Sequence, residues 1–229
     1  MSSEFPTDPY SSAQQKWLYQ DHLVLPTLEF SLKDRLRDKK VLDIGCGNGH
    51  NALSFLQWGA RKVIGFDYSQ EMIENCKNLH KESENLEFHH KSVTDFKFNE
   101  KFHVATAVFV LQYEDGGLFV GLIPNGVEGV VAPKNAGKVL GAEIEKRQVP
   151  FIDGGLVTAN FYEGDKVKCT STMALHSNEF YEKCFKAAGF SKFEWLAPKI
   201  SEKGNEVLGE EFLNQFMNPP CDIVFRVWK

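Results

Sequence analysis

The chain has 229 residues and a formal net charge of −5, with lysine and arginine spread along its whole length. This length suits one α/β domain with a sizeable core, and we expect a single domain over residues 1–229. The charge pattern is not the concentrated positive patch of proteins that bind nucleic acid or an anionic membrane, so we expect neither partner and favour a small-molecule or protein substrate.

Apolar runs and cysteines bear on the cellular compartment. The first residues hold no basic segment followed by an apolar run, and nowhere do about 18 apolar residues follow one another. The sequence therefore predicts a cytoplasmic protein. The cysteines are odd in number and lack C-x-x-C spacing, which predicts neither a disulfide framework nor a metal site. They are Cys46, Cys76, Cys169, Cys184 and Cys221.

The first 38 residues are predicted to form a helical cover. Apolar residues recur at helical spacing over residues 11–37, and Pro26 predicts a break near the middle of that helix. We expect residues 1–38 to pack on the edge of a sheet or to cover a bound cofactor.

The segment Val41–His50 reads VLDIGCGNGH, an apolar strand that runs through an acid into three alternating glycines. Glycines let the backbone turn sharply and approach a ligand closely, and the helix expected over residues 51–58 presents free N–H groups at its start. A second strand over residues 62–66 ends in Asp67, whose carboxylate could accept both hydroxyls of a ribose. A further helix is expected over residues 70–79, capped by Ser69. Two matched strand ends predict a nucleoside cofactor site.

The loop departs from the fingerprint of dinucleotide-binding proteins. That motif requires a small residue three places after its second glycine, where this chain has His50. Asp43 would repel a pyrophosphate, whereas it would attract a cationic amino-acid group. An NAD-dependent oxidoreductase is therefore disfavoured, and the ligand indicated is a nucleoside without phosphates.

With the Val41–Gly49 motif and Asp67, the sequence resembles the class I S-adenosylmethionine-dependent methyltransferases. The resemblance implies a doubly wound, Rossmann-like α/β fold with a mostly parallel sheet and an antiparallel last strand. It implies S-adenosylmethionine as the cofactor and a cofactor-binding half over residues 39–123. The cofactor-binding residues it implies are Asp43, Gly45, Cys46, Gly47, Asn48, Gly49, Asp67, Tyr68, Ser92, Val93 and Phe109. Within this set, Cys46 is expected to be a small buried residue rather than a nucleophile.

The third strand, expected over residues 86–90, is followed by Ser92 where the family often has an acid that accepts from the adenine amino group. Asp95 stands three residues later. Three arrangements remain open: Ser92 makes a weaker contact, Asp95 folds back, or backbone and stacking alone hold the adenine. A net hydrogen bond contributes only about 0.5–1.5 kcal/mol, so each arrangement allows binding.

The connection between the fourth and fifth strands, expected over residues 102–110 and 118–123, is short. Seven extended residues reach about 23 Å, an eight-residue strand is about 26 Å long, and a parallel return needs about a dozen residues. The segment Glu114–Gly117 would suit a hairpin with an antiparallel neighbour; the alternative is the scar of a removed crossover helix. Either form would suit a cofactor-binding protein with reduced or no catalytic activity, as in a splice variant or a divergent copy.

Residues 124–229 are expected to form the substrate side. A hairpin is predicted over residues 161–170, a helix over 176–189 that ends at Gly189, and strands over 192–196 and 222–228. Residues 195–198, 210–212 and 222–228 look similar to small-molecule methyltransferases of the toxoflavin-biosynthesis type. No catalytic residue is predicted, because holding acceptor and methyl group in line supplies much of the catalysis. We expect a monomer or a homodimer. The candidate substrate-binding residues are Tyr10, Trp17, Tyr113, Asn125 and His176.

Overall fold

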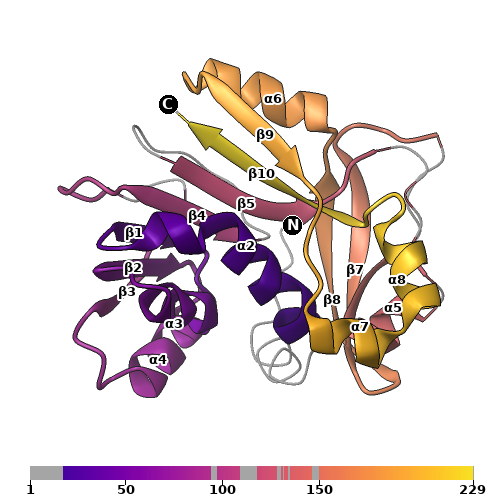
Figure 1. Ribbon diagram of the computed structural model, residues 1–229, viewed down its shortest axis with the longest axis horizontal. Helices are drawn as coiled ribbons and strands as arrows, with labels where there is room; N and C mark the ends of the chain where they lie inside the picture. The colour runs from indigo at the N-terminus through magenta and orange to yellow at the C-terminus, as the bar shows by residue number, and fades with distance from the viewer. Residues whose placement is uncertain are drawn as a thin grey trace. The chain divides into compact units, whose positions relative to one another are not determined.

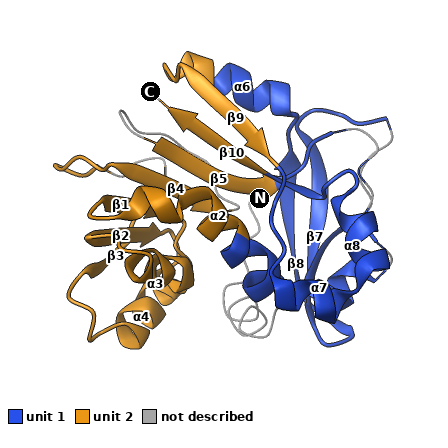
Figure 2. Cartoon of the chain, in the orientation of Figure 1, with its two compact units in different colours: residues 1–26, 124–184, 197–223 blue, residues 27–123, 185–196, 224–229 orange. Residues whose placement is uncertain are grey.

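The computed structural model describes residues 18–93, 97–108, 118–127, 130, 132–133, 135–145 and 150–228. Within them lie a seven-stranded sheet and a three-stranded sheet (Figure 1). The chain divides into two compact units, coloured separately in Figure 2. Unit 1 comprises residues 1–26, 124–184 and 197–223, and unit 2 comprises residues 27–123, 185–196 and 224–229.

The first half of unit 2 alternates strands and helices. Strands β1 (Lys40–Ile44), β2 (Lys62–Asp67) and β3 (Leu86–His90) are separated by α3 (His50–Gln57) and α4 (Gln70–Leu79). Strand β1 pairs in parallel with β2 and with β4 (Val104–Val108), and β2 pairs in parallel with β3. Four of the five residues of β1 are buried, as expected for a strand covered on both faces. Ser69 caps α4 as predicted, since its side chain accepts a hydrogen bond from the Met72 N–H.

The order of the seven strands is β3-β2-β1-β4-β5-β10-β9. The later strands are β5 (Leu118–Pro124), β9 (Lys192–Leu196) and β10 (Asp222–Trp228), and β10 runs antiparallel to β9. The predicted Rossmann-like architecture, mostly parallel with antiparallel strands at the end, is confirmed.

The hairpin predicted between the fourth and fifth strands is wrong. Strands β4 and β5 are parallel, with Val104 opposite Leu118 and Val108 opposite Leu122. A parallel return is within reach, because the five described residues of β4 extend about 17 Å, whereas the ten peptide steps from Val108 to Leu118 can span up to about 33 Å. Residues 109–117 lie outside the described part of the chain, and the removal of a helix there stays a hypothesis.

The break predicted in the N-terminal helix at Pro26 is wrong. A π-helical segment, η1 (Gln20–Val24), leads directly into α2 (Leu25–Leu36), and Pro26, the second residue of α2, has no N–H to donate to the preceding turn. The carbonyl of His22, four residues before Pro26, accepts instead from the N–H of Ser201 at 3.0 Å. The apolar stripe expected on this helix is confirmed for Leu28, Leu32 and Leu36, which are fully buried.

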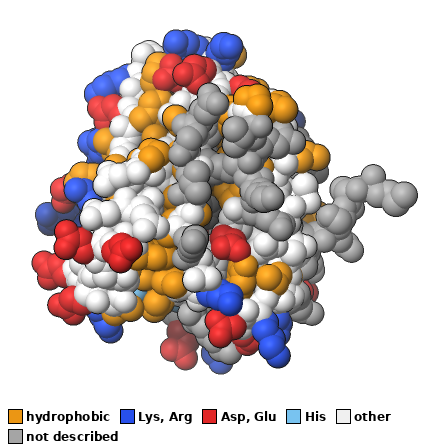
Figure 3. Space-filling view, turned by 90° about the vertical axis from the view of Figure 1, so that its right-hand side faces the viewer, with side chains coloured by type: hydrophobic (Ala, Val, Ile, Leu, Met, Phe, Trp, Pro, Cys, Tyr) orange, Lys and Arg blue, Asp and Glu red, His pale blue; other side chains and the backbone are white. Residues whose placement is uncertain are grey.

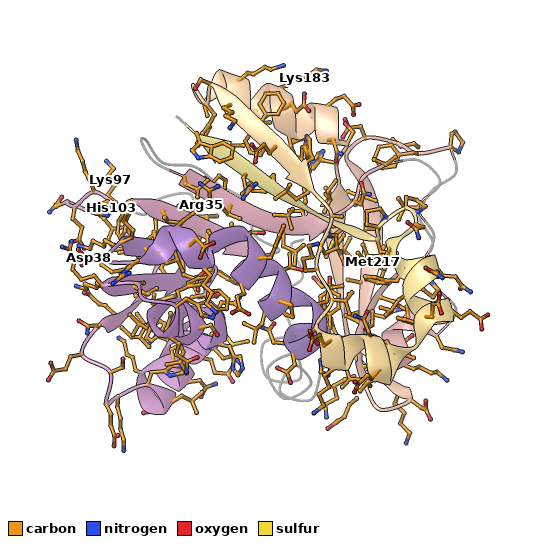
Figure 4. The ribbon with its side chains drawn as sticks, in the orientation of Figure 1. Arg35, Asp38, Lys97, His103, Lys183 and Met217 are labelled. Atoms are coloured by element: carbon orange, nitrogen blue, oxygen red, sulfur yellow. The ribbon has the colours of Figure 1, made fainter. Side chains whose placement is uncertain are left out.

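The turn from α2 into β1 fixes the start of the central strand. Asp38, labelled in Figure 4, has a left-handed φ of 58°, and its N–H donates to the Gly59 carbonyl at 2.9 Å. The N–H of Lys40 donates to Nδ1 of His103, also labelled there, at 3.2 Å. These bonds tie the beginning of β1 to the segments before β2 and β4.

An aromatic cluster forms the core around the later strands of unit 2. The Phe225 ring on β10 lies 5.0 Å from the Phe119 ring on β5 and 5.0 Å from the Phe185 ring. Gly121 leaves room for it, because a Cβ at that position would lie 2.2 Å from a Phe225 ring atom. Such aromatic packing contributes beyond its buried area and stabilises this end of the sheet.

Unit 1 contains the three-stranded sheet, ordered β6-β7-β8 and antiparallel throughout. Its strands are β6 (Ala142–Glu145), β7 (Gly155–Glu163) and β8 (Lys166–Leu175), and Gly164, at φ 61°, turns β7 into β8. The predicted hairpin over residues 161–170 is confirmed. The helices after β5 are α5 (Ala136–Leu140), α6 (Asn178–Ala187), α7 (Glu202–Leu208) and α8 (Glu210–Met217), and α6 confirms the helix predicted over residues 176–189. Among the described residues, no helix is both long and apolar enough to span a membrane.

Candidate functional site

The glycine loop between β1 and α3 is left-handed at all three glycines. The φ angles are 64° at Gly45, 53° at Gly47 and 77° at Gly49, a region that residues with a side chain enter at a cost of roughly 1–2 kcal/mol. A Cβ on Gly49 would lie 2.8 Å from the Phe88 ring, whereas a Cβ on Gly47 would meet nothing within 4 Å. The loop is therefore packed behind Gly49 and open beside Gly47, as a ligand cradle requires.

Asp67, at the end of β2, accepts hydrogen bonds from two backbone groups. Its Oδ2 accepts from the Gly47 N–H at 3.0 Å, and its Oδ1 accepts from the Ser69 N–H at 2.9 Å. The parallel pairing of β1 with β2 brings the two strand ends together, and the Cys46 N–H donates to the Phe66 carbonyl at 3.0 Å. A carboxylate has about four acceptor positions, so Asp67 keeps capacity for hydroxyl donors.

Asp43 is a buried carboxylate, 1% exposed, with one oxygen satisfied and one not. Its Oδ1 accepts from the Thr106 hydroxyl at 2.8 Å, whereas Oδ2 has no hydrogen-bond partner within the described part of the chain. Burial raises the pKa of Asp43 to about 7; the Thr106 hydrogen bond opposes this rise and the negative charge of Asp67 adds to it. A cationic group placed at Oδ2 would satisfy that oxygen and stabilise the ionised form.

The other predicted cofactor residues surround these groups. Asn48 is buried, and its Oδ1 accepts from the His50 N–H at 3.2 Å. Tyr68, directly after Asp67, has an exposed ring. The backbone carbonyl of Tyr68 accepts a hydrogen bond from Nε2 of His90 at 2.7 Å. Ser92 and Val93 are half-buried and follow Lys91, whose N–H donates to the Asp67 carbonyl. Both therefore lie beside the end of β2; Phe109 and Asp95 lie outside the described residues.

Cys46 within the loop is buried, as expected. A hydrogen bond with Cys76 and then burial raise the pKa of the Cys46 thiol well above its ordinary value. A neutral thiol is a poor nucleophile, which agrees with the structural role predicted for Cys46. All five cysteines are free, and the described residues include no group of three or more His, Cys, Asp or Glu that could hold a metal ion.

Of the candidate substrate-binding residues, only Asn125 and His176 are described; Tyr10, Trp17 and Tyr113 lie outside the described residues. Asn125 is buried, and its Nδ2 donates to the Pro220 carbonyl at 2.8 Å while its N–H donates to the Cys221 carbonyl. These bonds tie the end of β5 to the start of β10. A Cβ on Gly126 would lie 1.7 Å from the His176 carbonyl oxygen, so the chain beside Asn125 packs directly on His176.

His176 belongs to a small polar cluster that sequence reasoning did not find. Its Nδ1 lies 3.1 Å from Oδ1 of Asp153, and its ring stacks on Phe180 at 3.9 Å between centroids. Asp153 Oδ2 also accepts from the Ser177 hydroxyl at 2.7 Å, and hydrogen bonds from Ser177 first, then from His176, lower the pKa of Asp153. With Nδ1 donating to Asp153, Nε2 of His176 is an acceptor. The Asp-Gly-Gly turn before β7 is the sequence signal that marks this position.

Comparison with known proteins agrees with this geometry. Residues 41–118 match the family model described as "Methyltransferase domain". A tRNA U34 carboxymethyltransferase of Cellvibrio japonicus is 46% identical over 63 residues, which cover 25% of this chain and 18% of that protein. A demethylmenaquinone methyltransferase of Chlorobaculum parvum is 36% identical over 81 residues, covering 34% and 32%. The chain thus spans less than a third of the length of these curated relatives.

The similarity of fold extends over nearly the whole chain. An S-adenosylmethionine-dependent methyltransferase of Clostridium acetobutylicum has a TM-score of 0.54 at 16% identity, covering 98% of this chain and 92% of that one. At such low identity this likeness concerns the fold. Residues 41–118 thus match a methyltransferase domain, and the fold of the chain is similar to that of an S-adenosylmethionine-dependent methyltransferase.

Proposed function

We propose that this chain transfers a methyl group from S-adenosylmethionine to a small-molecule acceptor. The observation that carries the proposal is the buried Oδ2 of Asp43, which has no partner among the described residues and lies beside an open left-handed glycine loop. A buried carboxylate oxygen without a partner is costly, and the cationic ammonium of S-adenosylmethionine would remove that cost.

In this proposal each residue of the loop holds a different part of the cofactor. Asp43 would hold the ammonium group, Asp67 the ribose hydroxyls, and the exposed Tyr68 ring one face of the adenine, with Ser92 and Val93 near its edge. The bound cofactor would supply an electrophilic methyl group on a sulfonium. The open space beside Gly47 supports this assignment, because the cofactor can lie directly against the backbone there.

A small acceptor is favoured over RNA by charge. The net charge is −5, and acidic and basic side chains are interspersed on the face shown in Figure 3. RNA binding depends on concentrated positive charge. The relatives' names point to a tRNA and to demethylmenaquinone, so the names alone do not select an acceptor. The toxoflavin-type resemblance suggests testing heteroaromatic small molecules first.

On the acceptor side, His176 is the group suited to accept a proton. Asp153 would hold the imidazole with Nε2 free to accept, the arrangement that a general base needs when the acceptor must lose a proton. Asn125 would act indirectly, by fixing the chain that packs on His176.

The first test is a calorimetric titration of the purified chain with S-adenosylmethionine and with S-adenosylhomocysteine. We expect micromolar binding that is lost in Asp67→Asn and retained in Asp34→Asn, a matched change of an exposed acid on α2. Absence of binding by the wild-type chain would refute the proposed cofactor site.

The rival is a protein that binds the cofactor without turnover, and two features of the sequence favour it: the short connection over residues 111–117 and Ser92 in place of the family's acid. A panel of heteroaromatic, phenolic and amine acceptors, assayed for S-adenosylhomocysteine formation, separates the two. Turnover of any acceptor that is lost in Asp67→Asn supports the enzyme. Tight cofactor binding with no turnover across the panel supports the rival.

A further inference from the structure

We infer that helix α4 positions the glycine loop for the cofactor through Cys76 and His80, two residues outside the loop motif. The inference rests on the proposed cofactor site and adds to it two positioning residues. They stand one helical turn apart at the end of α4, with His80 as the C-cap residue, and so they project from the same side of the helix.

Three consecutive peptide groups of the loop are each held by a side chain from another element. The peptide before Gly47 is held by Asp67 of β2, which accepts from the Gly47 N–H at 3.0 Å. The peptide after Gly47 is held by Cys76, whose thiol donates to the Gly47 carbonyl at 3.0 Å. The next peptide is held by His80, whose Nε2 lies 3.3 Å from the Asn48 carbonyl and must donate to it, since a carbonyl only accepts.

Gly47 depends on such bonds more than its neighbours do. It has no side chain, and a Cβ there would meet nothing within 4 Å, so no side-chain packing at Gly47 itself holds its two peptide planes. In a trans peptide the C=O and the following N–H point in opposite directions. When Cys76 holds the Gly47 carbonyl, the Asn48 N–H is therefore directed away from α4, toward the open side of the loop.

The same peptides align the acid assigned to the ribose. Asp67 Oδ2 is oriented by the Gly47 N–H, and rotation about Gly47 would disturb this bond together with the direction of the Asn48 N–H. Loss of the α4 contacts should therefore weaken cofactor binding without removing any group that touches the cofactor. Cys76 is fully buried and His80 half-buried, so a purely structural role must be separated from a positioning role by experiment.

The test compares two kinds of variant. One kind keeps the side-chain volume but loses the hydrogen-bond donor, and the other keeps a hydrogen-bond donor. Cys76→Val and His80→Leu lose it, whereas Cys76→Ser and His80→Gln keep one. Ile73→Val, a conservative change at a fully buried position of the same helix, is the control for stability. Each full-length variant is titrated with S-adenosylmethionine by calorimetry and its Tm is measured.

We expect Cys76→Val and His80→Leu each to raise the Kd about three- to tenfold, since a net hydrogen bond has about that effect. Cys76→Ser and His80→Gln should bind within about twofold of wild type, and Ile73→Val should lower the Tm without changing the Kd. If Cys76→Val does not fold, the variants of the half-buried His80 test the positioning role instead.

Equal Kd values for wild type, Cys76→Val and His80→Leu would overturn the inference and leave the cofactor site intact. A Kd raised equally by the donor-keeping and donor-losing variants would overturn it in favour of packing alone. Absence of binding by the wild-type chain would instead refute the proposed function, and the positioning role with it.

Discussion

Two carboxylates, one in each unit, accept a hydrogen bond from a hydroxyl group and yet have opposite pKa shifts. Asp43 accepts from Thr106, is almost fully buried and has a raised pKa, whereas Asp153 accepts from Ser177, is half-exposed and has a lowered pKa. Burial raises the pKa of Asp43, whereas hydrogen bonds from Ser177 lower the pKa of Asp153. Oδ2 of Asp43 also has no partner in the described chain, while both oxygens of Asp153 accept. Asp153 is thus satisfied by neighbouring residues, whereas in the proposed function a cationic group of the cofactor would satisfy Asp43.

The largest expected effect that tests this comparison is the pH dependence of stability in Asp43→Asn. A carboxyl group with a pKa of about 7 in the folded chain and 3.8 in the unfolded chain favours folding while protonated. The wild type therefore loses stability as the pH rises from about 4 to beyond 7, by up to about 4 kcal/mol. Asparagine keeps an acceptor for Thr106 and does not ionise. In urea unfolding, the free energy of unfolding of the variant relative to that of the wild type should be higher at pH 8 than at pH 5. A difference that stays constant between the two pH values would contradict the assigned pKa.

The second effect is on cofactor affinity. At pH 8, Asp43→Asn should weaken binding of S-adenosylmethionine by about 1.5–3 kcal/mol, roughly ten- to a hundredfold, because the hydrogen bond to a charged partner becomes a neutral one. Calorimetry measures this directly. Below pH 7 the wild type should release protons on binding, since the ammonium group would lower the pKa of Asp43, and the variant should lack this component. An unchanged affinity in Asp43→Asn would place the ammonium elsewhere.

The third prediction compares two glycines of the loop, one packed against a neighbour and one facing open space. Gly49→Ala adds a Cβ 2.8 Å from the Phe88 ring in a left-handed conformation, and should lower the free energy of unfolding by about 1–3 kcal/mol. Gly47→Ala meets no neighbour and should cost only about 1 kcal/mol of stability. Its main effect should be on cofactor affinity, because the methyl group enters the space beside the loop. Chemical unfolding and calorimetry on both variants check this; a Gly47→Ala chain that binds normally would mean that the cofactor does not approach there.

How much of this could be predicted from sequence depends on whether a feature is set by local spacing or by contacts between distant residues. The glycine loop and Asp67 were predictable because the backbone requirements are local and the spacing of strand and turn is regular. The parallel pairing of β4 and β5 was not, since the reach of their connection depends on where each strand ends, and strand ends are poorly marked in an apolar run. The Asp153–His176 contact and the Cys76 and His80 contacts join residues 23 to 32 positions apart, and no spacing rule connects them.

The smallest expected effect is that of Asp153→Asn. Half-exposed charges are screened by solvent, so the loss of stability should stay below about 1 kcal/mol. Because the pKa of Asp153 is lowered, the stability it contributes is present above the ordinary pKa of an aspartate and is lost as the pH falls through the lower, folded-state pKa. The stabilities of wild type and variant measured by urea unfolding should therefore converge as the pH falls below the ordinary pKa of an aspartate. The affinity for S-adenosylmethionine should not change, whereas turnover of a proton-losing acceptor should fall severalfold, since the imidazole of His176 loses a charged partner. If cofactor affinity fell as much as in Asp43→Asn, the two carboxylates would not differ in the way that their hydrogen bonds indicate.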